Sequence, residues 1–70
     1  MKKEDVEKYI NKPVMLALKD NKSFYGTYIL KDDNTIIFKD RRRMEFPVDI
    51  SFIGTIIPVD KINYEGENHG

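Results

Sequence analysis

The 70-residue sequence has no cysteine, and its one histidine, His69, lies next to the C-terminal residue. The absence of cysteine excludes disulfides and thiolate metal sites. The sequence has no Ser–His arrangement and no glycine-rich phosphate loop, and pairs of carboxylates occur only where turns are expected. These absences predict a binding protein without a cofactor, not an enzyme.

The sequence also lacks a net charge and a long apolar run. It has 12 basic and 12 acidic residues, which argues against a strongly basic nucleic-acid binder but allows a local basic patch. Its apolar runs are too short to span a membrane. Charged residues in MKKEDVEKYI occupy the place where a signal peptide has its apolar core. We therefore expect a cytoplasmic protein that forms one small domain.

The stretch from Val14 to Asp40 contains three apolar runs separated by two polar turn segments. Asn and Asp tolerate the left-handed backbone and bond their own turns, so the two segments predict tight reversals between strands. The predicted strands are Val14–Lys19, Ser23–Lys31 and Thr35–Lys39, and the turns are Asp20–Lys22 and Asp32–Asn34.

Gly26 interrupts the second predicted strand and indicates a sharp bend or a close approach of another backbone. Such a bend lets one sheet curl over both halves of a small barrel. The alternation along this strand predicts one inward-facing set, namely Phe24, Gly26, Tyr28 and Leu30. The first strand is apolar on both faces, which predicts burial on both sides.

The remaining segments complete a mainly β fold. Lys3 to Ile10 predicts a short helix with an apolar face, the alternation from Met44 to Ile50 predicts a half-buried fourth strand, and Gly54–Val59 predicts the fifth. We expect a strongly bent, five-stranded antiparallel sheet that forms a small open barrel over residues 1–62. Residues 63–70 are polar and predict a disordered tail.

The pattern from Val14 to Asp40 resembles the first motif of the Sm-like (LSm) family, which includes the bacterial RNA chaperone Hfq. The shared elements are an apolar strand, a polar turn, the apolar-x-Gly of Phe24 to Gly26, Asp32 six residues later, and an apolar run that ends at Asp40. The resemblance covers roughly residues 4 to 59. It implies a homo-oligomeric ring, of six or seven subunits in most relatives, that binds single-stranded RNA.

The resemblance also implies which residues contact RNA. In the family, the loop between the second and third strands binds a base, which places that role on Asp32, Asn34 and Thr35. Asn34 occupies the stacking position without an aromatic ring. The family's Arg-Gly or Lys-His pair before the last strand falls on Ile50 and Ser51, so the cation found there in relatives is replaced. The alternative interpretation of this loop is an ordinary polar turn.

Two further features suggest RNA contacts. Arg41, Arg42 and Arg43 form the one basic cluster of the sequence and are expected on a loop, where they would bind phosphate or remain solvated. Tyr25 lies in the stretch from Lys22 that corresponds to the adenine-binding face of Hfq. Tyr25 would stack a base if it is exposed, or fill the core if it is buried.

Other interpretations remain open at this point. Asp20, Asp32, Asp33 and Asp40 are oxygen ligands that suit Mg²⁺ or Ca²⁺, but their spacing matches no metal loop and turn chemistry explains them better. Five strands leave open edges, which invite pairing with another chain. The resemblance implies that these edges pair head-to-tail into a ring of five to eight subunits. Pro47 falls in a strand that would pair across that interface. A ring that serves as a protein scaffold, or a monomeric SH3-like barrel that binds a peptide, would fit a similar pattern.

Overall fold

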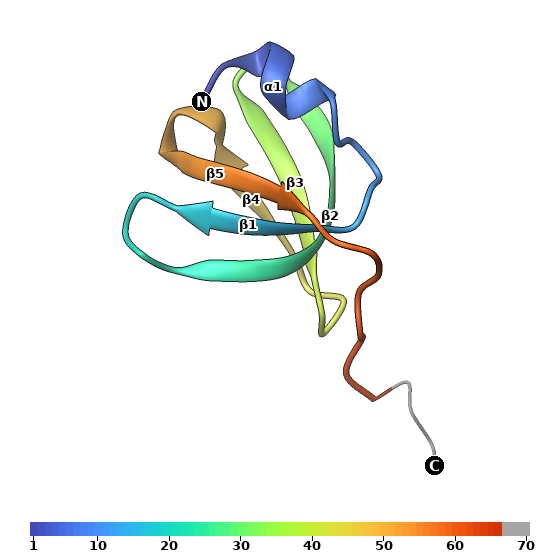
Figure 1. Ribbon diagram of the computed structural model, residues 1–70. Coiled ribbons are helices and arrows are strands. Elements are labelled where there is room, and N and C mark those ends of the chain that lie inside the picture. The colour runs from blue at the N-terminus through green and yellow to red at the C-terminus, as the bar shows by residue number, and fades with distance from the viewer. Residues whose placement is uncertain (67–70) are drawn as a thin grey trace.

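A computed structural model describes residues 1–66 as a short helix followed by one five-stranded antiparallel sheet (Figure 1). The elements are α1 (Lys3–Glu7), β1 (Val14–Leu18), β2 (Ser23–Asp32), β3 (Thr35–Asp40), β4 (Glu45–Asp49), the 3-10 helix η1 (Ile50–Phe52) and β5 (Ile53–Pro58). The mainly β architecture with five antiparallel strands is therefore confirmed. Residues 67–70, which include His69, lie outside the described part of the chain.

Strand β2 connects the two halves of the sheet, and Gly26 is the residue at which its pairing changes from β1 to β3. Residues 23–26 pair with β1, whereas residues 26–32 pair with β3. A Cβ atom on Gly26 would lie 1.9 Å from the carbonyl oxygen of Lys39, so no other residue fits there without a shift of the backbone. Of the two alternatives that the sequence offers for this glycine, a sharp bend or a close approach of another backbone, the close approach is present.

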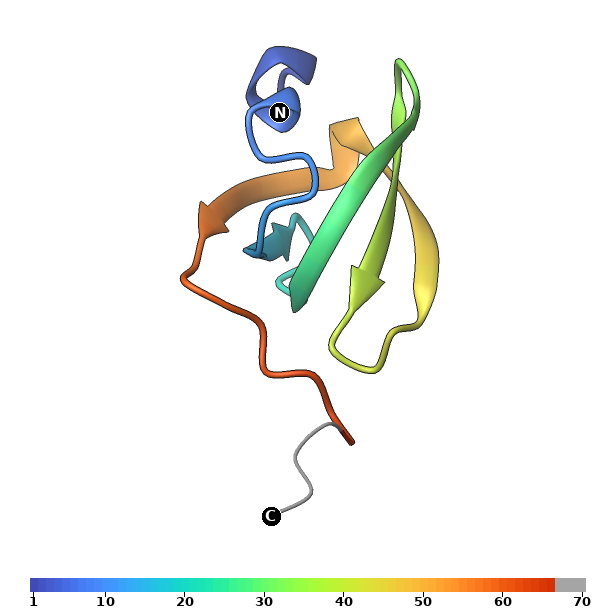
Figure 2. The same cartoon turned by 90° about the vertical axis from the view of Figure 1, so that its right-hand side faces the viewer.

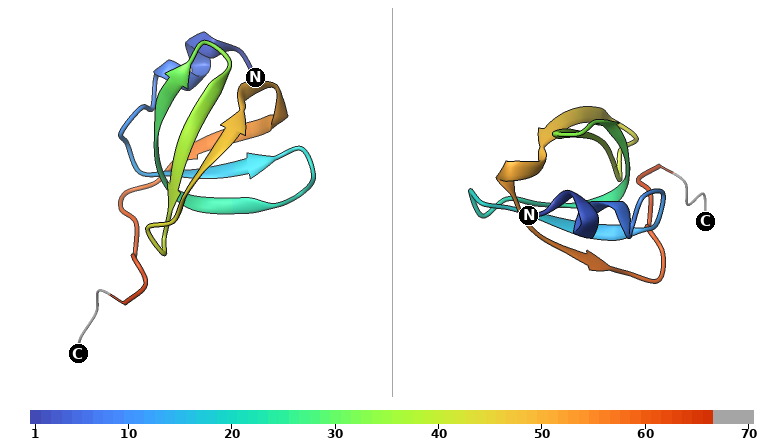
Figure 3. Two further views of the ribbon diagram at one scale, coloured as in Figure 1. Left: turned by 180° about the vertical axis from the view of Figure 1, so that it is seen from behind. Right: turned by 90° about the horizontal axis from the view of Figure 1, so that it is seen from above.

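The sheet order is β4-β3-β2-β1-β5, and the sheet is not closed into a barrel. Within the described residues, β4 and β5 do not pair with each other, so each leaves one edge free. Figure 2 and Figure 3 show that the sheet folds over itself, and the view from above places α1 over the opening between its two halves. The Sm-like form of this sheet remains a prediction.

The core lies between the two halves of the sheet and below α1. The predicted inner face of β2 is confirmed, since Gly26 and Tyr28 are buried and Phe24 and Leu30 are half-buried. The fully buried side chains that fill this space come from α1, all the inner strands and the start of β5: Tyr28, Phe38, Leu16, Ile36, Ile53, Val6 and Val14. Burial of this apolar surface is the main stabilising term of the fold.

The helix is shorter than the sequence predicts. It ends after Glu7 instead of Ile10, because the chain continues in tight turns, with the amide of Lys12 donating to the carbonyl of Tyr9 at 3.0 Å. Asn11 then adopts a left-handed backbone with φ of 64°. The predicted apolar face is nevertheless used, since Val6 is buried and Tyr9 and Ile10 pack against the core.

Two predictions of burial are corrected. The second face of β1 is only half-buried at Met15 and Ala17, so this strand is not buried on both sides. Met44, predicted to begin the apolar face of β4, is 59% exposed because the chain is still in the loop at that point and β4 begins at Glu45. Phe46, Val48 and Ile50 do face the core.

Prolines interrupt the donors on both free edges. The amide of Asp40 donates to the carbonyl of Met44, so these two residues form a hydrogen-bonded pair. Hydrogen-bonded and non-hydrogen-bonded pairs alternate along an antiparallel ladder, so Ile37 and Pro47 form a non-hydrogen-bonded pair. The nitrogen of Pro47 therefore faces the free edge of β4, and the β3–β4 ladder loses no bond. At the other edge, the amide of Val59 donates to the carbonyl of Pro13, so the next pair, Val14 and Pro58, is not hydrogen-bonded. The nitrogen of Pro58 therefore faces the free edge of β5.

Candidate nucleic-acid interface

The structure divides the seven predicted RNA-binding residues between opposite ends of the sheet. Asp32, Asn34 and Thr35 lie at the β2–β3 turn beside α1, which we call the helix end. Tyr25 and the three arginines lie where β3 turns into β4, at the other end in Figure 1. We call this second group the arginine end.

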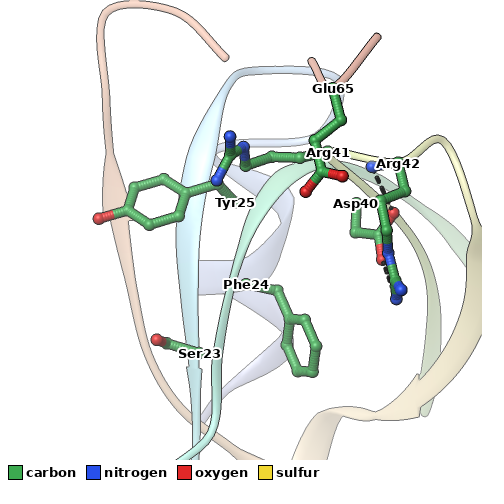
Figure 4. Close-up of a pocket in the computed structure, with 7 residues that line it drawn as sticks. All are labelled: Ser23, Phe24, Tyr25, Asp40, Arg41, Arg42 and Glu65. Atoms are coloured by element: carbon green, nitrogen blue, oxygen red, sulfur yellow. Dashed lines mark hydrogen bonds and ion pairs between the residues drawn. The ribbon is translucent and has the colours of Figure 1, made fainter. Parts of the chain in front are cut away.

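The pairing of Gly26 with Asp40 assembles the arginine end. This register puts Tyr25, one residue before Gly26, beside Arg41, one residue after Asp40. Tyr25 and Arg41 line two adjoining hollows, one of which also contains Arg42. Figure 4 shows Tyr25 and Arg41 extending toward the same side, whereas Phe24 points away from them. Residues that are 16 positions apart in the sequence thus form one surface.

Tyr25 is exposed, which answers the question that the sequence left open. Its side chain is 46% exposed and lies on the face of the sheet opposite the core. The register places Met15 of β1 and then Ile57 of β5 in line with it, so the ring stands at the end of a short apolar row. Phe24 packs on the core side against Phe46 at 5.2 Å between ring centroids.

Asp40 holds the arginine loop in shape. Asp40 is 5% exposed, and its Oδ1 accepts the backbone amides of Arg42 at 2.9 Å and Met44 at 3.1 Å. Its Oδ2 lies 3.4 Å from the Arg42 guanidinium. Arg43 adopts a left-handed backbone with φ of 65° to complete the turn. A buried acid therefore fixes the loop that carries the three exposed arginines.

The segment after β5 folds back onto this loop. Arg41 Nε donates to the carbonyl of Asn63 at 2.9 Å, and the amide of Glu65 donates to the carbonyl of Arg41 at 2.9 Å. The Arg43 guanidinium lies over the ring of Tyr64, 4.7 Å from its centroid, at a distance typical of a cation–π contact. Residues 63–65, part of the segment predicted as a tail, thus have defined contacts with the arginines.

The turn at the helix end satisfies most of its own polar groups. Asp32 Oδ1 accepts the amide of Asn34 at 2.8 Å, as in an Asx turn, and the carbonyl of Asn34 accepts the amide of Ile50 at 2.8 Å. Lys3 of α1 donates to Asp33 at 2.7 Å. This contact lowers the pKa of the Asp33 carboxyl, through a hydrogen bond and the lysine charge, and raises the pKa of Lys3.

The turn before β5 meets the β2–β3 turn at the helix end. Ile50 is buried, and Ser51 donates through both its amide (2.9 Å) and its hydroxyl (2.6 Å) to Asp49 Oδ1. These bonds lower the pKa of the Asp49 carboxyl. Lys3, which is paired with Asp33, supplies a cation near this junction, but neither turn contributes one. The helix end is therefore polar and predominantly acidic.

The metal alternative gains no site in the described part of the chain. Asp40 lies at the arginine end, away from Asp32 and Asp33, and no group of three acidic, histidine or cysteine side chains suited to a metal ion occurs within residues 1–66. In that same range, no helix has the length and apolar character needed to cross a membrane.

Several residues of the arginine end were not singled out from the sequence. Asp40 was recognised as the end of a strand motif, but its role in holding the arginine loop depends on its burial. Lys61 falls at the end of the predicted domain and Asn63 and Tyr64 fall in the predicted tail, and no spacing in the sequence connects them with the arginines. An available signal was the aromatic and basic character of Lys61 and Tyr64 within an otherwise polar stretch.

Comparison of the chain with protein-family models, curated proteins and solved structures finds no match.

Proposed function

We propose that this protein binds single-stranded RNA through its arginine end and assembles as an Sm-like homo-oligomer. The observation that carries the proposal is the placement of an exposed aromatic ring, Tyr25, beside Arg41 and Arg42 on one surface. Nucleobases stack on exposed aromatic rings while arginines contact the adjacent phosphates, and this combination tolerates many sequences. The same surface offers a binding role and no arrangement of groups for covalent chemistry.

The local charge favours RNA at the arginine end over the helix end. Three arginines follow one another in the loop, whereas the helix end carries Asp32, Asp33 and Asp49. Because the whole chain has no net charge, long-range attraction is weak and binding depends on this local cluster. Contacts to phosphate release counterions, so the affinity should fall steeply with salt.

Three features support the Sm-like part of the proposal. The sheet order places the first and last strands side by side, β2 changes partner at Gly26, where the sequence predicts a bend, and α1 lies over one open end. The free edges of β4 and β5 supply surfaces for head-to-tail pairing into a ring. Pro47 and Pro58 each remove one donor from these edges, so such a ladder would be short and would depend on side-chain packing.

The decisive experiment measures the salt dependence of binding to labelled single-stranded RNA by fluorescence anisotropy. The variant Arg41→Ala/Arg42→Ala/Arg43→Ala should lose most of its affinity, and the slope of log affinity against log salt should flatten by up to about 2, since each phosphate contact to a single strand contributes about 0.7. A control with the same loss of charge is Lys2→Ala/Lys12→Ala/Lys31→Ala, whose lysines are exposed and lie outside the arginine end.

Each outcome of this experiment has a distinct meaning. If the wild-type protein does not bind RNA at low salt, the proposed function is wrong. If both triple variants lose affinity equally, binding is a diffuse charge effect and the arginine end is not the site. Tyr25→Ala adds an independent reading, because loss of one stacking contact should cost about 1–3 kcal/mol without changing the salt slope.

A protein-interaction scaffold is the second candidate. One observation in its favour is that Ile50 and Ser51 occupy the positions where the resemblance implies a base-binding cation. A second is that several apolar side chains are exposed: Ile29, Met44, Phe52 and Ile57. Native mass measured together with the 260/280 nm absorbance ratio, before and after nuclease, separates the candidates. A ring without nucleic acid supports the scaffold, and a monomer contradicts the ring in both.

A further inference from the structure

The C-terminal segment forms one wall of a hollow beside Tyr25. This hollow is lined by Tyr25 of β2, Arg41 of the β3–β4 loop and residues 61–63, which follow β5. The bond from Arg41 Nε to the carbonyl of Asn63 fixes the segment to the loop. Three parts of the chain that are distant in sequence, namely β2, the β3–β4 loop and the segment after β5, therefore line one hollow on the surface.

The groups that line this hollow match the parts of a nucleotide: an aromatic ring for the base, cations for the phosphate and an amide for the edge of the base. Tyr25 offers an exposed aromatic face, and Arg41 and Lys61 offer two cations. The backbone carbonyl of Asn63 is used by Arg41, but the side-chain amide of this exposed residue carries both donors and an acceptor. An amide of this kind hydrogen-bonds the edge of a base.

The neighbouring hollow on the other side of Arg41 differs in charge. It is lined by Asp40, Arg42 and Glu65 together with residues 23–25 and Arg41. The carboxylates of Asp40 and Glu65 lie beside Arg41 and Arg42 and offset their positive charge, as Figure 4 shows. Phosphate is repelled by carboxylates, so the side of Arg41 that faces Lys61 is the better place for an anion.

We propose that the hollow between Tyr25 and the Lys61–Asn63 segment is a nucleotide subsite for single-stranded RNA. The base stacks on Tyr25, its phosphate lies between Arg41 and Lys61, and the amide of Asn63 contacts the edge of the base. The subsite rests on the proposed function and extends it, because the segment after the last strand becomes part of the binding surface.

The test uses the full chain, with labelled single-stranded homopolymers of each of the four bases as probes. Lys61→Ala should weaken binding to all four and reduce the salt slope by about 0.7, the contribution of one phosphate contact. Lys61→Arg should restore the slope, because it keeps the charge. Asn63→Ala should leave the slope unchanged and reduce the difference in affinity among the four homopolymers.

Lys31→Ala is the matched control, since Lys31 is also exposed and lies on β2 toward the helix end. If Lys61→Ala behaves like Lys31→Ala, the subsite is wrong while RNA binding itself stands. An increase in affinity for Lys61→Ala or Asn63→Ala also overturns the subsite, because it would identify the segment as a competitor of RNA. Absence of binding by the wild-type protein refutes the proposed function and the subsite together.

Discussion

The two ends of the bent sheet are built from the same kind of turn and have opposite surface chemistry. At both, an aspartate at the end of a strand accepts amides from the following turn: Asp32 at the helix end and Asp40 at the arginine end. Asp32 is exposed and accepts the amide of Asn34, whereas Asp40 is buried and accepts two amides and an arginine. Burial of the acid leaves the outer surface of the second turn to the arginines.

This difference teaches how a neutral chain acquires a cationic surface. A turn stabilised by exposed acids has a negatively charged surface. A turn stabilised by a buried acid has a surface charge that is set by the other side chains of the loop. The predictions below test whether the two ends behave as separate units.

The largest expected effect is that of Gly26→Ala. The new Cβ would lie 1.9 Å from the carbonyl oxygen of Lys39, so the backbone must shift and the pairing with Asp40 must open. We expect a loss of about 3 kcal/mol or more in the free energy of unfolding, measured by urea denaturation. Gly54→Ala is the control, since its Cβ meets its nearest atom at 3.1 Å; an equal loss there would contradict the special role of Gly26.

Asp40→Ala should damage the arginine end more than Asp32→Ala damages the helix end. Loss of the buried carboxylate leaves the amides of Arg42 and Met44 without their partner, at a cost of about 1–3 kcal/mol, whereas the exposed Asp32 should cost under about 1 kcal/mol. Denaturation measures both values. NMR spectra should show shifts in residues 41–44 for Asp40→Ala alone, and equal costs would remove the distinction between the two turns.

Tyr28→Phe should loosen the helix end. The Tyr28 hydroxyl donates to the carbonyl of Val6 and thereby ties β2 to α1, so its removal should cost about 1 kcal/mol at neutral pH. Amide exchange should accelerate in α1 and remain unchanged in the arginine loop. Exchange that accelerates equally at both ends would show that they are one cooperative unit.

The same tyrosine predicts an alkaline pH dependence. Burial raises the pKa of Tyr28 from 10.0 to about 12, so the folded state holds its proton after the unfolded state has lost it. The stabilising contribution is complete below pH 10 and is lost as the pH rises toward 12. Denaturation as a function of pH should show this decline in the wild-type protein and a weaker one in Tyr28→Phe.

The smallest expected effect is that of Lys3→Ala. Its exposed ion pair with Asp33 adds little to stability, so the unfolding midpoint should hardly change. The pKa of the Asp33 carboxyl, now lowered, should rise toward its ordinary value of 3.8, which an NMR titration measures. The lowered pKa gives wild type a small stability advantage over Lys3→Ala above pH 3.8, and this advantage should disappear as the pH falls through the lowered pKa of Asp33.

Much of the fold followed from local patterns. The alternation along residues 23–31 predicted the inner face, the Asp and Asn clusters predicted both reversals, and Gly26 indicated a bend or the close approach of another backbone, which is that of β3. The end of α1 was missed because Val6, Tyr9 and Ile10 have helical spacing even though the chain leaves the helix after Glu7. Met44 was misplaced because alternation does not show where a loop ends and a strand begins.

The candidate site followed from the sequence in its parts and not in its arrangement. Arg41 to Arg43 and Tyr25 were each recognised by residue type, but the sequence could not tell whether Tyr25 is exposed. The loop with Asp32, Asn34 and Thr35 was grouped with them through the resemblance, whereas the structure places it at the opposite end of the sheet. A pattern of residue types carries no distances, so residues from different loops cannot be assigned to one surface.

By itself the sequence determined the mainly β character and the positions of the turns, because these depend on periodicity and backbone sterics within a few residues. The contact that requires glycine at residue 26 comes from Lys39 on the neighbouring strand. Tertiary structure alone decided that Tyr25 meets Arg41, that Asp40 is buried beneath the arginine loop and that residues 63–65 return to it. The physical reason is that strand register and burial are properties of the assembled sheet, in which pairing brings together groups that the chain keeps far apart.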